Sequence, residues 1–168
     1  MHIDISDLLG KRVTEKKVDI SFEGKNIMFE GEEISFAEPV NIKGIFKLSG
    51  NIVDFSGKLS AVLSLNCSRC LEKFNYPLEI EINEEFSKQE NDKDNDNDII
   101  IINSDRVDFS PIIETNIILS LPMKKLCSEE CKGLCSVCGV NLNHSTCDCD
   151  KNDIDPRLAK LGDFFAKN

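Results

Sequence analysis

The cysteine spacing constrains this chain more than any other feature, because six of its eight cysteines fall within 23 residues. Cys135 and Cys138 form a CxxCG motif, in which a tight turn brings two thiolates together and Gly139 accepts the unusual backbone torsion that follows. Cys147 and Cys149 lie close enough along the chain to supply two more sulfurs. The sequence therefore predicts a four-cysteine metal site, for which zinc is the expected ion.

A second site is predicted from the remaining four cysteines. Cys67 and Cys70 form another CxxC pair, although Leu71 stands where Gly follows in the first motif. Cys127 and Cys131 are four residues apart, so one helical turn would place both thiols on the same side. If the Cys67–Cys70 pair and the Cys127–Cys131 pair share one metal ion, they form a second four-cysteine site. Such a site would hold the C-terminal region against the rest of the chain. A single site with some thiols left free is the alternative.

Two catalytic interpretations of the cysteines are less consistent with the sequence. A thioredoxin-like CxxC begins a helix after a strand in a βαβ unit, and no such pattern surrounds either pair. An open catalytic zinc site keeps water and has His or Glu nearby, and His144 is the single histidine near the cluster. His144 is favoured as a loop residue or a spare ligand, so the sequence predicts structural metal and no catalytic residues.

Alternating apolar and polar residues predict a largely antiparallel sheet. Three long strands are expected over 40–48, 53–65 and 76–86, each with one buried and one solvated face. The Cys67–Cys70 pair falls between the second and third strands, at the tip of a hairpin. A meander or a partly closed barrel is expected, completed by shorter strands at 18–22, 26–29, 34–36 and 99–102.

Helices are expected at two positions, which makes the predicted fold class α+β. Ser110 and Pro111 open the first helix as N-cap and first helical residue, and Pro122 ends it. This helix should pack on the sheet. Residues 155–165 have an N-cap Asp and an apolar stripe that predict a second helix. The expected division is a β-rich core over 1–122 and a cysteine-rich zinc module with the C-terminal helix over 123–168.

The chain is acidic, with a net charge of −10, and half of that charge is concentrated in one segment. Residues 84–98 contain seven acidic residues and two lysines, too few apolar side chains to offset the entropy of ordering. A mobile acidic loop is expected at 87–98. The spacing from Asp92 to Asp98 resembles a calcium loop, but Asn97 and Asn103 replace the glycine and glutamate that such a loop needs.

The compartment expected from the sequence is the cytoplasm. The first residues are acidic where a signal peptide is basic, and the longest apolar run, Ile99 to Ile102, is too short for a membrane helix. Thiols in the cytosol stay reduced, so clustered cysteines there more often bind metal than form disulfides. No membrane association and no small-molecule substrate are expected.

Several motifs spread over roughly residues 35–165 occur together in this chain. They are Cys67-Ser-Arg-Cys70-Leu71, Asp108-Phe-Ser-Pro-Ile112, Leu121-Pro-Met123, Cys131-Lys-Gly-Leu-Cys135-Ser-Val-Cys138-Gly139-Val-Asn141-Leu-Asn143, Cys147-Asp-Cys149 and Ile154-Asp-Pro-Arg157. With these motifs the chain resembles the bacterial large ribosomal RNA subunit accumulation proteins, the YceD-like family. The resemblance implies a role in accumulation of 23S ribosomal RNA and in large-subunit assembly, without known catalysis.

Two functions from different classes remain open at this stage. The first is a non-enzymatic assembly factor whose partner is a basic ribosomal protein or the 23S precursor, the latter reached through basic residues such as Lys124 and Lys125. The net negative charge opposes non-specific binding to RNA. The second is a thiol redox or metal-buffering protein. Reversible loss of metal on oxidation would distinguish the second function from the first.

Overall fold

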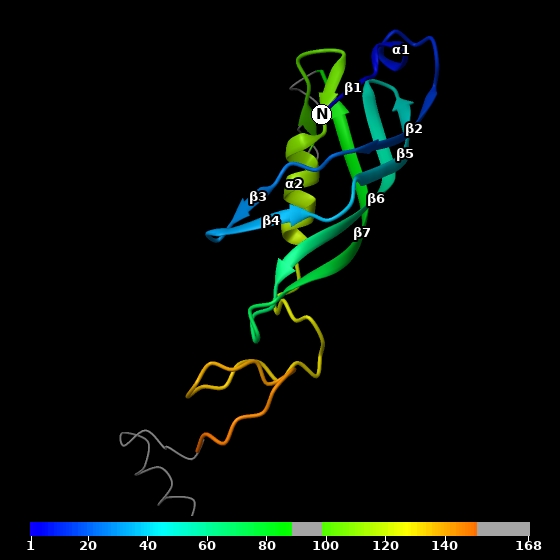
Figure 1. Ribbon diagram of the computed structural model, residues 1–168. Coiled ribbons are helices and arrows are strands. Elements are labelled where there is room, and N and C mark those ends of the chain that lie inside the picture. The colour runs from blue at the N-terminus through cyan, green and yellow to red at the C-terminus, as the bar shows by residue number, and fades with distance from the viewer. Residues whose placement is uncertain (89–98, 151–168) are drawn as a thin grey trace, which may run out of the picture.

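The fold is a β-rich body with a cysteine-bearing segment at one end (Figure 1). The computed structural model describes residues 1–88 and 99–150. Its elements are, in chain order, β1 (His2–Asp4), α1 (Ser6–Leu9), β2 (Glu15–Phe22), β3 (Ile27–Phe29), β4 (Glu32–Phe36), β5 (Val40–Ser49), β6 (Ile52–Asn66), β7 (Lys73–Ser87), β8 (Ile100–Ile101), β9 (Arg106–Asp108) and α2 (Ser110–Leu119).

The strands form a seven-stranded sheet and a separate two-stranded pair of β1 with β9. In the large sheet, β2, β5, β6 and β7 are successive antiparallel neighbours. β4 pairs with Leu63 and Ser64 of β6, beyond the residues of β6 that pair with β5. β8 pairs with β7 in parallel. Among the described strands, β2 and β8 stay unpaired on their outer sides, so the sheet is not a closed barrel. Of the two expected arrangements, the structure has the largely antiparallel sheet.

The core lies between one face of this sheet and α2, which runs along the sheet in Figure 1. Four phenylalanines form its centre. The ring centroid of Phe55 lies 4.7 Å from that of Phe46 and 4.9 Å from that of Phe109. Ile113 and Ile117 of α2 are buried in the same cluster. The predicted packing of this helix on the sheet is therefore confirmed.

The long strands agree with the alternation in the sequence, whereas several local features differ from it. β5, β6 and β7 bury the expected faces. The helix begins one residue earlier than predicted, with Ser110 as its first residue, because the Asp108 carboxylate upstream accepts the backbone N–H of Ser110 at 3.0 Å. Strands β1 and β9 and helix α1 were not predicted.

The acidic segment begins within β7. Glu84 and Glu85 lie within β7, opposite Phe55 and Asp54 of β6, because the buried Phe86 extends the strand beyond them. The rest of the predicted acidic loop, residues 89–98 with most of its calcium-like spacing, lies outside the described residues, as does the predicted helix over 155–165.

The solvated face of the sheet carries lysines and acids in cross-strand pairs. Each pair lies on adjacent strands and is largely exposed, so its contribution to stability is small. The pairs are Lys43 with Asp19 at 3.2 Å, Lys47 with Glu15 at 3.4 Å and Lys58 with Glu81 at 3.5 Å. These lysines therefore do not form a continuous basic surface. Neither described helix is long and apolar enough to cross a membrane.

Glycine is required where the Phe55 ring crosses the β5–β6 pair. Gly44 and Gly57 lie opposite each other, and a β-carbon on Gly57 would lie 2.7 Å from the Lys43 carbonyl oxygen and 2.8 Å from the Phe55 ring. We expect Gly57→Ala to lower the free energy of unfolding by about 1–3 kcal/mol, because the ring must move. Chemical denaturation measures the change, and Ser60→Ala on the exposed face is the control. Equal stability of the two variants would contradict this packing.

Candidate metal centre

The candidate site begins at the turn between β6 and β7. In this turn the Cys67 N–H donates to the Glu72 carbonyl at 2.8 Å, and the Leu71 N–H donates to the Cys67 carbonyl at 2.9 Å. The Arg69 N–H points at the Cys67 sulfur, 3.5 Å away. Leu71 has a φ of 62°, which is the left-handed conformation that a glycine adopts easily.

The turn that contains Cys135 and Cys138 repeats this geometry. The Cys135 N–H donates to the Val140 carbonyl at 2.8 Å, and the Gly139 N–H donates to the Cys135 carbonyl at 2.9 Å. The Val137 N–H lies 3.5 Å from the Cys135 sulfur, and φ of Gly139 is 73°. Both CxxC pairs are therefore folded as the same knuckle turn, although only one of them carries the glycine.

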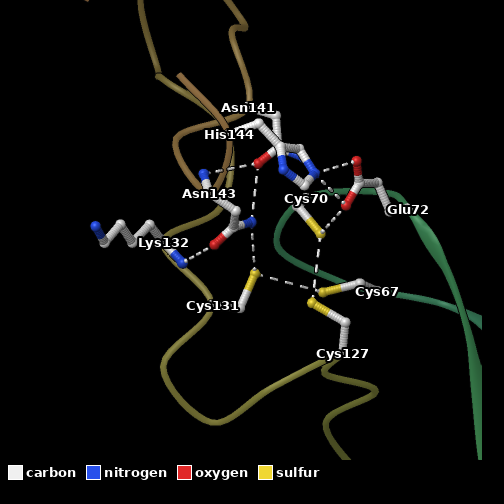
Figure 2. A network of polar contacts seen from close by, with 9 residues as sticks. All are labelled: Cys67, Cys70, Glu72, Cys127, Cys131, Lys132, Asn141, Asn143 and His144. Atoms are coloured by element: carbon white, nitrogen blue, oxygen red, sulfur yellow. Dashed lines mark hydrogen bonds and ion pairs between the residues drawn. The ribbon is translucent and has the colours of Figure 1, made fainter. Parts of the chain in front are cut away.

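The first quartet consists of Cys67, Cys70, Cys127 and Cys131, whose sulfurs converge in Figure 2. The sulfurs of Cys67 and Cys131 are 3.8 Å apart, and those of Cys70 and Cys127 are 3.7 Å apart. All but Cys127 are buried. The apolar side chains packed around them belong to Phe74, Leu126 and Leu134.

The second quartet consists of Cys135, Cys138, Cys147 and Cys149. Cys135 is buried, Cys138 is exposed, and the other two are half-buried. This quartet is therefore more open to solvent than the first. In each quartet all four sulfurs lie within 4.8 Å of one another.

Both groups fit a tetrahedral zinc ion by the nature and spacing of their donors. A Zn–S bond of about 2.3 Å in a tetrahedron separates neighbouring sulfurs by about 3.8 Å, which the first quartet matches. Thiolates are also preferred zinc ligands, and four of them leave no position for water. Four thiolates around one ion would make a closed site.

The thiols of each quartet differ in acidity because some face backbone donors and others face sulfur. Burial opposes ionisation of Cys67, but three backbone N–H groups outweigh it and lower the pKa of its thiol to about 6. Backbone N–H groups of the second turn lower the pKa of Cys135 to about 6. Contacts with a neighbouring sulfur raise the pKa of Cys127 and of Cys149 to about 12. Thiols bind a metal ion as thiolates, so metal binding at either quartet would release the protons that its thiols still carry.

Backbone contacts fasten the C-terminal cysteines to the hairpin tip. The Arg69 guanidinium donates to the carbonyls of Glu129 and Cys131 at 3.2 and 2.9 Å. The Leu134 N–H donates to the Arg69 carbonyl at 3.1 Å. Gly133, with φ of 72°, allows this approach because a β-carbon there would lie 3.0 Å from the same oxygen. The hairpin and the cysteine segment therefore form one unit.

The structure brings together both sets of four cysteines in the pairing expected from the sequence. That these thiols bind metal stays a prediction. Cys127 and Cys131 meet the hairpin through a turn closed by a Cys131 N–H to Ser128 carbonyl bond of 3.1 Å, and not through a helical turn. His144 is in neither quartet and lies 2.9 Å from a Glu72 carboxylate oxygen.

Sequence reasoning missed three polar side chains around the first quartet. They are Arg69, Glu72 and Asn143, which contact it from the hairpin and from the segment after the second knuckle. Residue type and spacing alone give no signal for them, because each acts through a contact that exists only in the folded chain. In the sequence, Arg69 is only one of the two residues that separate Cys67 from Cys70.

The comparisons with known proteins indicate one family. Residues 55–165 match the family model described as "Large ribosomal RNA subunit accumulation protein YceD". The chain is 35% identical over 130 residues to the uncharacterized protein YlbN of Bacillus subtilis (strain 168), covering 77% of this chain and 76% of that one. The chain belongs to the YceD family.

A second relative matches a shorter region. It is the chloroplastic "Large ribosomal RNA subunit accumulation protein YCED homolog 1" of Arabidopsis thaliana, 34% identical over 58 residues. This match covers 34% of the chain and 18% of the plant protein. No solved structure matches the chain significantly.

The left-handed Leu71 is a local strain that a glycine would relieve. An L-residue in this conformation costs about 1–2 kcal/mol, and Leu71 is 68% exposed, so little packing is lost on its removal. We expect Leu71→Gly to raise the stability of the first knuckle by up to about 1 kcal/mol and Gly139→Ala to lower that of the second by about as much. Hydrogen exchange of the amides in the two turns measures both. Weaker protection in the Leu71→Gly variant, or unchanged protection in the Gly139→Ala variant, would contradict this account of the two turns.

Proposed function

We propose that this chain is a non-enzymatic factor that supports accumulation of 23S ribosomal RNA and assembly of the large ribosomal subunit in the cytoplasm. The observation that carries the proposal is the family match over residues 55–165, whose description names large ribosomal RNA subunit accumulation. The plant relative carries the same name. Closed four-thiol groups support a structural role, because they offer no open coordination position for a substrate.

Zinc at both quartets is part of this proposal. Cys67, Cys70, Cys127 and Cys131 would hold one ion, and Cys135, Cys138, Cys147 and Cys149 a second. The described residues of 123–150 have no helix and a single isolated bridge, between Leu134 and Asn141. A segment with so little regular structure gains its order from cross-links and from its contacts with the hairpin.

A basic ribosomal protein is the partner that the charge distribution favours. The net charge of −10 opposes a long-range attraction to RNA. Lys43, Lys47 and Lys58 of the sheet pair with acids, and Lys125 lies 2.5 Å from the Glu32 carboxylate, so the charges of these four lysines are partly neutralised. Contact with the 23S precursor through Lys124, which is exposed, is the second possibility.

Metal buffering or thiol redox chemistry is the alternative function. Exposed Cys127 and Cys138 and the acidic thiols of Cys67 and Cys135 favour it. A redox switch would release metal reversibly when a mild oxidant is added. A structural site would keep its metal until the cysteine segment unfolds.

Metal content tests the proposed sites directly. We expect the reduced full-length protein to contain two zinc ions per chain, and Cys70→Ser and Cys138→Ser each to lose one, because each removes a ligand from a different quartet. Elemental analysis measures the content, and Ser136→Ala in the same knuckle is the matched control. Circular dichroism should show that the Cys138→Ser variant retains its strands. Unchanged metal content in either Cys variant would remove that thiol from the site.

The ratio of ribosomal RNAs tests the cellular role. We expect deletion of the gene to lower 23S relative to 16S ribosomal RNA and large relative to small subunits, and a plasmid copy to restore both. Quantitative RNA analysis and sedimentation profiles measure these changes. A ratio that stays normal in the deletion strain would contradict the proposed function.

Salt dependence distinguishes the two partners. Direct binding to 23S fragments would weaken steeply with salt, since each phosphate contact releases counterions. We expect no such binding by the purified chain, and capture of a basic ribosomal protein from ribosomal extracts instead. A strong, salt-sensitive shift of 23S fragments would contradict the protein partner.

A further inference from the structure

The side chain of Asn143 contacts the first quartet although the chain around it belongs to the second. Its Nδ2 donates to the Cys131 sulfur at 3.3 Å and to the Asn141 Oδ1 at 2.8 Å, and its Oδ1 accepts the Lys132 N–H at 2.8 Å (Figure 2). Both donors and the acceptor of the amide are used, which fixes its orientation. Asn143 therefore holds the Cys131 sulfur at a defined place in the first quartet.

The position of Asn143 is set by the second knuckle. Asn141 forms the bridge to Leu134, the residue just before Cys135, and its Oδ1 accepts the Asn143 backbone N–H at 2.9 Å. The Leu142 N–H donates to the Gly133 carbonyl at 2.9 Å. The knuckle and the residues after it therefore form a continuous set of bonds that reaches from Cys135 to Cys131.

A second contact joins the same loop to the hairpin. His144 lies 2.9 and 3.2 Å from the two carboxylate oxygens of Glu72, and Glu72 is 3.9 Å from the Cys70 sulfur. Both partners are largely exposed, so this pair contributes less than the part-buried contact between Asn143 and the Cys131 sulfur. The loop after the second knuckle thus covers the first quartet from two directions.

We propose that the two quartets bind their metal ions cooperatively, and that Asn143 is the positioning residue that couples them. An ion bound by Cys135 and its partners orders the knuckle, and the ordered knuckle places Asn143 against Cys131. The first quartet then needs less ordering to bind its own ion. The coupling is reciprocal, because either ion strengthens binding of the other by the same factor. The inference rests on the proposed metal sites.

A thermodynamic cycle on the full-length protein measures this coupling with cobalt(II) as the probe. Absorbance from sulfur-to-cobalt charge transfer follows binding, and competition with a chelator gives the constants. The double variant Cys138→Ser/Cys149→Ser keeps only the first quartet as a binding site. The double variant Cys67→Ser/Cys70→Ser keeps only the second. We expect the overall association constant for two ions in the wild type to exceed the product of the two single-site association constants. This excess should be about tenfold or more, the usual effect of groups that position a ligand.

Asn143 variants show whether this residue carries the coupling. In Asn143→Ala, the ratio of the two-ion constant to the product of the single-site constants should fall to about one, since the donor to Cys131 is gone. Asn143→Asp keeps the acceptor for the Lys132 N–H and lacks the donor, so it should give the same result without loss of that backbone bond. Ser145→Ala, in the same loop, is the matched control and should keep the full excess.

The outcomes separate this inference from the metal proposal. Two ions per chain with no excess in the wild type, or with an excess that survives both Asn143 variants, would overturn the coupling and leave the sites intact. Fewer than two ions in the wild type would overturn the proposed sites and the coupling with them.

Discussion

The pairing of β6 with β7 is the constraint on which the rest of the structure depends. Both strands are 15 residues long and pair over their whole length. At one end they supply Phe55 and Phe86 to the core, and at the other they end in the turn that holds Cys67 and Cys70. A shift of register by one residue would reverse the faces of the strand, so the hydrophobic core also fixes where these two thiols point.

The cysteine segment depends on this hairpin for its order. Its apolar cluster is small, formed by Leu126 and Leu134 with Phe74 of β7 around the first quartet. Arg69 and the two knuckle turns supply most of its remaining contacts. A metal ion held by four thiols would cross-link such a segment, since a core of this size cannot offset the entropy of ordering it. The proposed assembly role would then use a surface that the sheet and the cysteine segment share.

Periodicity and spacing predicted the parts of the molecule that repeat a simple rule. Alternation located β5, β6 and β7, and two CxxC pairs with two looser pairs indicated the eight thiols that converge. The features that were missed depend on contacts between distant residues. The β1–β9 pair joins Ile3 to Val107, Leu71 adopts a left-handed conformation that its sequence disfavours, and Asn143 acts only through folded neighbours. The sequence left open whether the sheet closes, because closure depends on where the edge strands end.

X-ray absorption at the zinc edge of the reduced full-length protein tests the central claim most directly, because it reports the atoms around the metal. Two closed four-cysteine sites require a shell of four sulfurs at about 2.3 Å with no nitrogen or oxygen. A mixed shell containing light atoms would contradict closed sites and would indicate ligands such as His144 or water. Protein purified without any bound metal under reducing conditions would contradict the claim altogether.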